Sequence, residues 1–302
     1  MNPAFLQALQ QILEKEQYKI DEPMSSHITF RVGGVADCYV KPSLKQLPEV
    51  ISLCQQFEIP WQIIGNGSNL LVGDKGIRGV VIEMGRNADK ITIDGNTIAA
   101  EAGAMLAATA KQAAREGLAG MEFASGIPGT IGGAVVMNAG AYGGEMKDII
   151  KSVTVLDKTG RQKTLTNEEL NLSYRHSSIP ENEYIVLKAE LELLKGEKES
   201  IEARMEELKK QRIAKQPLEY PSAGSTFKRP EGYFAGKLIQ DAGLRGFQVG
   251  GAQVSEKHCG FVINKDHATA ADIDCLIREV QNAVESKYGV RMETEVKYIG
   301  EF

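Results

Sequence analysis

The chain has 302 residues, 42% of them hydrophobic and 25% charged, as in an ordinary globular protein. One hydrophobic core seldom serves a chain of this length, so we expect two domains. The net charge of -5 argues against a general nucleic-acid binder. No apolar run approaches the ~20 residues of a membrane span. We expect a cytoplasmic monomer without nucleic-acid or membrane partners.

The four cysteines are too scattered for a zinc site or a disulfide framework, and we expect reduced thiols and no metal site. They are Cys38, Cys54, Cys259 and Cys275. The first segment, residues 2–17, has apolar residues at helical spacing with charges among them. This pattern predicts a surface helix and not a signal peptide.

The next part of the chain alternates short strands with a few helices. Strands at 36–42 and 61–65 enclose a helix at 44–59, a βαβ-like unit. A strand at 79–84, a hairpin at 90–103 turning at Asp94-Gly95, and a helix at 105–117 ended by Gly117 follow. A second hairpin at 151–166 and a long strand at 183–194 complete this part.

The composition changes near residue 196. A charged helix at 196–217, ended by Pro217, is predicted to expose its charges. Then come a loop at 221–230, a helix at 235–244, strands at 248–255 and 259–264, a helix at 271–289 and a strand at 292–300. The hairpins argue against a doubly wound parallel sheet. The sequence predicts two α+β domains, residues 1–196 and 197–302.

Two glycine-rich stretches are candidates for phosphate binding. GNGSNLLV (65–72) contains G-x-G, but Leu70 stands where a dinucleotide fingerprint has its third glycine. An apolar, strand-like run follows where that fingerprint would open a helix. The chain has no Walker sequence. A tight loop between strands explains this stretch equally well.

The second stretch, SGIPGTIGGAVVMNAGAYG (125–143), has six glycines. Pro128 biases Ile127 towards extended backbone, and the glycines can adopt positive φ. Successive N–H groups could then form an anion-binding nest without a helix, and the apolar residues between them suit a planar ring. A buried hairpin is the alternative, and the residues alone leave both open.

Two such loops about sixty residues apart, after a βαβ-like unit, resemble the FAD domain of the vanillyl-alcohol-oxidase or PCMH type. Five further stretches occur in order: SSHITFRVGG (25–34), SYRHSSI (173–179), AGSTFKRP (223–230), AGKLIQDAGLRGFQVGGAQVSEKHCGFVIN (235–264) and METEVKYIG (292–300). Together the seven resemble the UDP-N-acetylenolpyruvoylglucosamine reductase family. Only EGYFA separates Pro230 from Gly236, which resembles the shorter, second type of this family.

The resemblance implies a PCMH-type FAD-binding domain of two subdomains over 1–196 and a smaller α+β substrate-binding domain over 197–302. It implies that NADPH reduces non-covalently bound FAD, and that the enolpyruvyl group of a UDP-sugar is then reduced to the lactyl ether of UDP-N-acetylmuramate for peptidoglycan. The cofactor-binding residues it implies are Gly65, Asn66, Gly67, Ser68, Asn69, Ser125, Gly126, Pro128, Gly129, Thr130, Gly132 and Gly133.

Three catalytic residues follow from the same resemblance. Arg175 in SYRHSSI matches the arginine that pairs with the developing enolate or carboxylate, for which a guanidinium is well shaped. Ser225 in AGSTFKRP matches the serine that protonates C2 of the substrate. Glu295, directly before V-K-Y-I-G, matches the glutamate that assists proton transfer. Glu293 lies two positions earlier and would share its strand face.

Substrate contacts are expected from three more residues. Lys228 and Arg229 lie close to the serine and could hold the UDP pyrophosphate, and His258 stands where another branch of the family carries a glutamine that touches the substrate. A structural histidine is an equal alternative for His258, and His27 is not expected to anchor flavin covalently. The rival functions are a PCMH-type FAD oxidase of an alcohol or sugar and a non-catalytic nucleotide-sugar-binding module.

Overall fold

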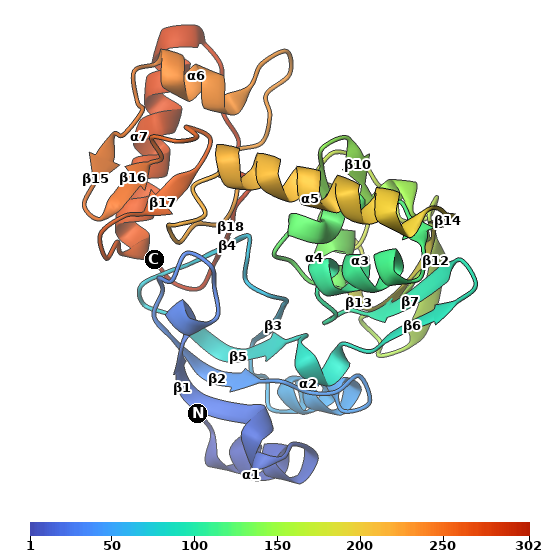
Figure 1. The fold of residues 1–302 in the computed structure, drawn as a ribbon. Helices are drawn as coiled ribbons and strands as arrows, with labels where there is room; N and C mark the ends of the chain where they lie inside the picture. Colours follow the sequence, from blue (N-terminus) through green and yellow to red (C-terminus); the bar gives the residue numbers. More distant parts are fainter. The chain divides into compact units, whose positions relative to one another are not determined.

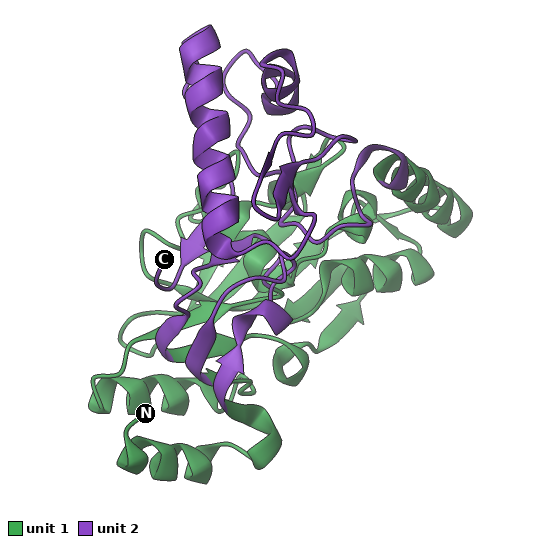
Figure 2. Cartoon of the chain, turned by 90° about the vertical axis from the view of Figure 1, so that its left-hand side faces the viewer, with its two compact units in different colours: residues 1–19, 39–66, 80–212 green, residues 20–38, 67–79, 213–302 purple.

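The computed structural model describes residues 1–302, which form two compact units (Figures 1 and 2). Unit 1 comprises residues 1–19, 39–66 and 80–212, and unit 2 comprises residues 20–38, 67–79 and 213–302. Each unit therefore draws on three segments of the chain. The boundary expected after residue 196 separates an FAD-binding domain from a substrate-binding domain, and that division stays a prediction.

Unit 1 is built on a five-stranded antiparallel sheet with the order β12-β11-β13-β7-β6. Alternate side chains of its central strands are fully buried, as Val153 and Val155 of β11 and Ala189 and Leu191 of β13 show. Helix α4, Ile131–Met137, packs against β13 and β7. The strands are β6 Ile91–Asp94, β7 Thr97–Glu101, β11 Ile150–Leu156, β12 Gln162–Thr166 and β13 Ile185–Glu192.

The helices of unit 1 are α1 Pro3–Ile12, α2 Leu47–Gln56, α3 Leu106–Arg115, α4 Ile131–Met137 and most of α5 Lys198–Lys215. Short strand pairs are β8 Leu118–Ala119 with β14 Leu194–Lys195, and β9 Gly140–Ala141 with β10 Gly144–Glu145. Helices α1 and α2 pack together, and the rings of Phe5 and Phe57 meet edge to face. The apolar face of α1 therefore packs against α2.

A four-stranded sheet has the order β1-β2-β5-β3, with β1 Tyr18–Pro23, β2 Val35–Val40, β3 Trp61–Ile64 and β5 Ile77–Glu83. β3 runs parallel to β5, from Trp61 opposite Val80 to Ile64 opposite Glu83. Gly65 follows directly, so the first glycine loop leaves the carboxyl end of this strand. The expected βαβ-like unit is confirmed.

Unit 2 contains a three-stranded antiparallel sheet, β15 Gln248–Val249, β16 Ala252–Val254 and β17 Val262–Asn264, against which α7 Ala270–Tyr288 packs. α7 starts at the capping box of Thr269 and ends at Gly289, whose φ is +67°. The shorter α6 is Ala235–Asp241. β18 Lys297–Ile299 pairs in parallel with β4 Leu70–Val72.

Several local expectations need correction. α1 stops at Ile12, because Leu13 is extended and a 3-10 turn follows at Lys15–Gln17. The first hairpin turns at Gly95-Asn96, one position later than expected, since Asp94 still pairs with Thr97. The last strand covers only Lys297–Ile299, so Glu293 and Glu295 do not share a strand face.

The glycine-rich stretch 125–143 differs most from its expected structure. It was expected to lack a helix, yet α4 begins within it, capped by Thr130. Gly132 and Gly133 disfavour a helix, but Ile131 and Val135 are fully buried, and this burial offsets the cost. A buried hairpin does not describe the stretch. In the whole chain, no helix has the length and apolar character to cross a membrane.

Candidate functional site

The two glycine loops meet in unit 1. Asn66 Nδ2 donates a hydrogen bond to the carbonyl oxygen of Pro128 at 2.7 Å. Gly65 lies against Thr130, and a Cβ at position 65 would collide with Thr130 Oγ1. The resemblance had assigned both loops to one cofactor, and the structure brings these parts of them together.

Backbone hydrogen bonds fix the second loop from one side. The N–H groups of Ile131 and Gly132 donate to the carbonyl oxygens of Ala104 and Ala102, both at 2.8 Å, and the carbonyl of Gly129 accepts from Leu106 N at 3.0 Å. The N–H groups of Gly129 and Thr130, and that of Asn66, donate to no protein acceptor. Thr130 is buried and Gly129 is half-buried, where amides are normally paired, so these open N–H groups are suited to an anion.

The glycines of α4 differ in their surroundings. A Cβ on Gly132 would lie 3.0 Å from Ala102 Cβ, so packing within the protein explains that glycine. Gly133 is exposed, and the nearest atom to its Cβ position is Thr130 Oγ1 at 3.7 Å. Protein packing therefore does not require glycine at position 133.

An anionic cofactor fits these loops. No acidic side chain lies within 65–69 or 125–133, and Ser125 turns its hydroxyl to the carbonyl of Glu122 at 2.8 Å. The open amides suit a pyrophosphate, and the bare Gly133 leaves room for a close approach.

Arg212 lies beside the second glycine loop, a place that was not predicted for it from the sequence. Its guanidinium lies over Gly126, where a Cβ would be 3.1 Å from Arg212 Cδ and 3.6 Å from Nη1. Burial lowers the pKa of Arg212, and no carboxylate pairs with it. The charged helix had been predicted to expose its charges. The signal was available, because Arg212 follows the buried Leu208 by four residues and shares its helix face.

Arg175 stands at a tight turn in unit 1. Ser173 and His176 exchange both backbone hydrogen bonds, at 3.2 and 3.1 Å, so Tyr174 and Arg175 are the turn residues. Arg175 has a φ of +54°, its Nη2 donates to the carbonyl of Gly140 at 3.3 Å, and its guanidinium lies 5.3 Å from the Tyr174 ring centroid. The second glycine stretch thus also contacts the expected catalytic arginine.

The segments that carry Ser225 and Glu295 meet in unit 2 at Thr226, which is fully buried. The N–H of Glu295 donates to the carbonyl of Thr226 at 2.8 Å, and Thr226 Oγ1 accepts from Val262 N at 2.9 Å. Asn69, expected to bind cofactor, donates from Nδ2 to the carbonyl of Glu295 at 3.0 Å. Two distant motifs and Asn69 of the first glycine loop are therefore joined through the backbone of Thr226 and Glu295.

The expected substrate residues have partners within unit 2. Lys228 Nζ forms an ion pair with Glu293 at 2.9 Å, which lowers the pKa of Glu293. The Arg229 guanidinium lies 4.0 Å from the ring centroid of the exposed Phe234, and its Nε donates to the carbonyl of Tyr233 at 3.2 Å. Both cations remain at the surface, where a phosphate could compete with these partners.

His258 is held by its neighbours. Its Nδ1 accepts from Gly260 N at 3.1 Å, and its ring meets Phe261 edge to face at 5.0 Å. Burial lowers the pKa of His258, so the neutral ring with hydrogen on Nε2 is favoured. This tautomer leaves one donor for a ligand.

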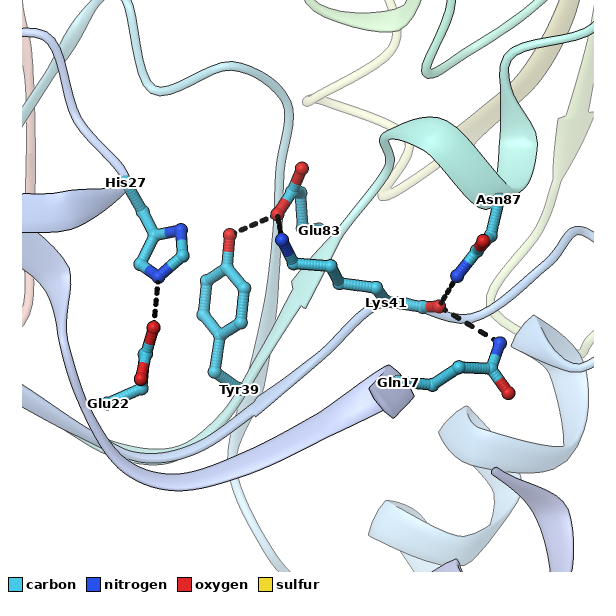
Figure 3. A network of polar contacts seen from close by, with 7 residues as sticks. All are labelled: Gln17, Glu22, His27, Tyr39, Lys41, Glu83 and Asn87. Atoms are coloured by element: carbon cyan, nitrogen blue, oxygen red, sulfur yellow. Dashed lines mark hydrogen bonds and ion pairs between the residues drawn. The ribbon is translucent and has the colours of Figure 1, made fainter. Parts of the chain in front are cut away.

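Figure 3 shows polar contacts made by residues outside the two glycine loops. His27 Nε2 lies 2.7 Å from Glu22 Oε1, so this imidazole is engaged by a carboxylate. Separately, Glu83 accepts from the hydroxyl of the buried Tyr39 and pairs with Lys41 Nζ at 3.2 Å. The second contact fixes the end of β5, next to which β3 ends and Gly65 begins.

Comparisons with known proteins agree over nearly the whole chain. Residues 216–299 match the C-terminal domain of UDP-N-acetylenolpyruvoylglucosamine reductase, and residues 36–166 match an FAD binding domain. A reductase of that name from Agathobacter rectalis is 54% identical, with both chains covered completely. One from Clostridioides difficile is 55% identical over 96% of each chain.

Solved structures give the same result. UDP-N-acetylenolpyruvylglucosamine reductase from Thermus caldophilus superposes with a TM-score of 0.80 at 35% identity, covering 93% of this chain and 98% of the other. An alkyldihydroxyacetonephosphate synthase reaches a TM-score of 0.51 at 18% identity, over 65% of this chain and 41% of the other. That second likeness concerns the fold alone.

Proposed function

The chain belongs to the UDP-N-acetylenolpyruvoylglucosamine reductase family, and from this premise we propose that it uses NADPH to reduce the enolpyruvyl ether of a UDP-sugar to the lactyl ether of UDP-N-acetylmuramate. It is an FAD oxidoreductase of peptidoglycan synthesis. The observation that supports the assignment of roles is the hydrogen bond between Glu295 N and Thr226 O, which joins the segment of Ser225 to that of Glu295.

FAD would be bound non-covalently by the two glycine loops. The open N–H groups of Asn66, Gly129 and Thr130 would receive its pyrophosphate, and Arg212 would neutralise part of the charge. The other proposed contacts are Gly65, Gly67, Ser68, Asn69, Ser125, Gly126, Pro128, Gly132 and Gly133. When bound, FAD would serve as the hydride carrier, which accepts hydride from NADPH and passes it to C3 of the enolpyruvyl group.

Three side chains would serve the second half of the reaction. Arg175 would hold the substrate carboxylate and stabilise the negative charge that develops beside it. Ser225 would donate the proton to C2, and its half-buried hydroxyl donates to no protein acceptor that would have to be displaced. Glu295 would assist that transfer from the adjacent segment.

Lys228, Arg229 and His258 would bind the UDP part of the substrate. The ion pair of Lys228 with Glu293 is at the surface, so exchange of the carboxylate for a diphosphate costs little. Residues 1–196 would form the FAD-binding domain and 197–302 the substrate-binding domain, in agreement with the matched ranges 36–166 and 216–299. We propose a cytoplasmic monomer without a nucleic-acid partner.

Anaerobic stopped-flow spectroscopy of the two half-reactions tests this function. NADPH should bleach the flavin, and the enolpyruvyl UDP-sugar should restore its colour. Ser225→Ala should leave bleaching intact and slow recolouring by about 10²-fold or more, the typical contribution of an acid–base group. Ser222→Ala, in the same loop, is the matched control.

The outcome separates the competing functions. A flavin that NADPH does not bleach but an alcohol or sugar does would favour an oxidase. A protein that does not bind FAD would favour a non-catalytic nucleotide-sugar module. Equal loss of both half-reactions in Ser225→Ala would refute the role of proton donor.

A further inference from the structure

The second half of the glycine-rich stretch contacts the Arg175 turn at three points within unit 1. Asn138 Nδ2 donates to the carbonyl of Ser173 at 3.0 Å, before the turn. Arg175 Nη2 donates to the carbonyl of Gly140 at 3.3 Å, and Ser177 Oγ donates to the carbonyl of Val136 at 2.7 Å. The stretch that begins at the proposed cofactor loop therefore ends by holding the loop of the proposed catalytic arginine.

The turn needs such support. Arg175 has a φ of +54°, in the left-handed region that costs a non-glycine residue about 1 kcal/mol or more. The mutual hydrogen bonds of Ser173 and His176 close the turn but do not fix its direction. External contacts must set the direction in which the guanidinium points.

Asn138 is placed to do this. It is fully buried and left-handed, with a φ of +44°, at the end of α4. Its Nδ2 also donates to Glu145 Oε2 at 3.0 Å, and its Oδ1 accepts from Lys147 N at 2.8 Å. Two donors and one acceptor are all used, so an amide is required here. An aspartate would lose both donors and face the Glu145 carboxylate.

We propose that Asn138 is a positioning residue for Arg175: its carboxamide ties the Ser173 carbonyl to the end of α4 and so directs the guanidinium. The inference rests on the proposed function, in which Arg175 pairs with the substrate carboxylate. Loss of the Asn138 side chain would then impair flavin reoxidation by the enolpyruvyl UDP-sugar and leave flavin reduction by NADPH intact.

Two pairs of variants test it. Asn138→Gly removes the carboxamide and tolerates the left-handed backbone. Glu58→Gly is its control, because Glu58 is also left-handed, with a φ of +53°, but is exposed and lies outside the turn. Ser177→Ala removes one hydrogen bond, from the Ser177 hydroxyl to the carbonyl of Val136, and is the smaller perturbation. Ser178→Ala is its control, since this adjacent buried serine donates instead to the carbonyl of Glu169 at 2.9 Å.

The first readout is hydrogen–deuterium exchange in the protein without substrate. The amides of Ser173 and His176 should exchange faster in Asn138→Gly and, to a smaller extent, in Ser177→Ala. Neither control should change them. The second readout is the pair of half-reactions. Reoxidation in Asn138→Gly should slow by about tenfold to 10²-fold, as small misplacements of a catalytic group do, while reduction stays within about twofold.

The results distinguish the inference from its premise. Unchanged exchange and unchanged reoxidation in Asn138→Gly would overturn the inference while the function stands. If Asn138→Gly does not fold, Ser177→Ala against Ser178→Ala decides by the same criteria. If the unaltered enzyme does not reoxidise with the enolpyruvyl UDP-sugar, the proposed function fails, and the exchange rates still decide whether Asn138 holds the turn.

Discussion

We expect a substitution of Gly133 by alanine to raise the stability of the protein without cofactor and to lower its affinity for FAD. Gly133 is an exposed residue of α4, and no protein atom lies closer than 3.7 Å to the position of a Cβ. Glycine weakens a helix, so some other partner must explain its presence there. We expect that partner to be the cofactor, whose close approach a side chain would block.

The magnitudes follow for Gly133→Ala. Without FAD, the substitution should raise the free energy of unfolding by about 0.5–1 kcal/mol, the usual preference of a helix interior for alanine. For a protein of this size that raises Tm by roughly 1–4 °C. With FAD, the added methyl group should cost about 1–3 kcal/mol of binding free energy, as overpacking does, or roughly a 5- to 150-fold rise in Kd.

Differential scanning calorimetry of the apoprotein and fluorescence titration with FAD measure the two effects. Gly132→Ala is the contrasting variant. Its Cβ would lie 3.0 Å from Ala102 Cβ, so it should lower the Tm of the apoprotein. An unchanged Kd for FAD in Gly133→Ala would refute the argument that the cofactor covers this residue.

Three further predictions concern charges and thiols. Arg212→Gln should weaken FAD binding by about 1.5–3 kcal/mol, and an unchanged Kd in titrations would exclude Arg212 from the cofactor site. Burial lowers the pKa of His258 in the folded protein. As the pH falls, the imidazole is therefore protonated in the unfolded chain before it is protonated in the folded one. The contribution of neutral His258 to the free energy of unfolding is complete above about pH 6.5 and is lost below it. His258→Gln should therefore flatten the fall of Tm on acidification through this range, and an unaltered slope would contradict this. Burial raises the pKa of the Cys54 thiol to about 12, whereas Cys275 is exposed, so Cys275→Ser should abolish the rapid reaction of the native protein with a thiol reagent.

Sequence patterns predicted a helix or strand accurately where its start and end signals agreed with its hydrophobic pattern. The α7 helix has both a capping box at Thr269 and a terminal glycine, and it was predicted to within a residue at its N-terminus. The glycine-rich stretch shows the opposite case. Its composition argues against a helix, and only the burial of Ile131 and Val135 against the rest of unit 1 makes α4 form. Tertiary packing overrides local preference there.

The same limit applies to the site. Family resemblance predicted catalytic roles for Ser225 and Glu295, but the link through Thr226 joins segments that sequence alone does not relate. Arg212 could have been found from its spacing to Leu208, whereas Asn138 could not. The role of Asn138 depends on a left-handed helix end and on a carbonyl 35 residues away. Such contacts become visible only once the chain is folded.

Unit 2 is assembled from segments that are far apart in the sequence, and this has a consequence for biosynthesis. β4 has its parallel partner in β18, and the side chain of Asn69 bonds to a carbonyl 226 residues further on. At about 5–20 residues per second, a ribosome needs roughly 10–45 s to add that length of chain. During this interval β4 presents an unpaired edge to other nascent chains. A protein that lacks its final residues, through early termination or proteolysis, would keep that edge permanently exposed.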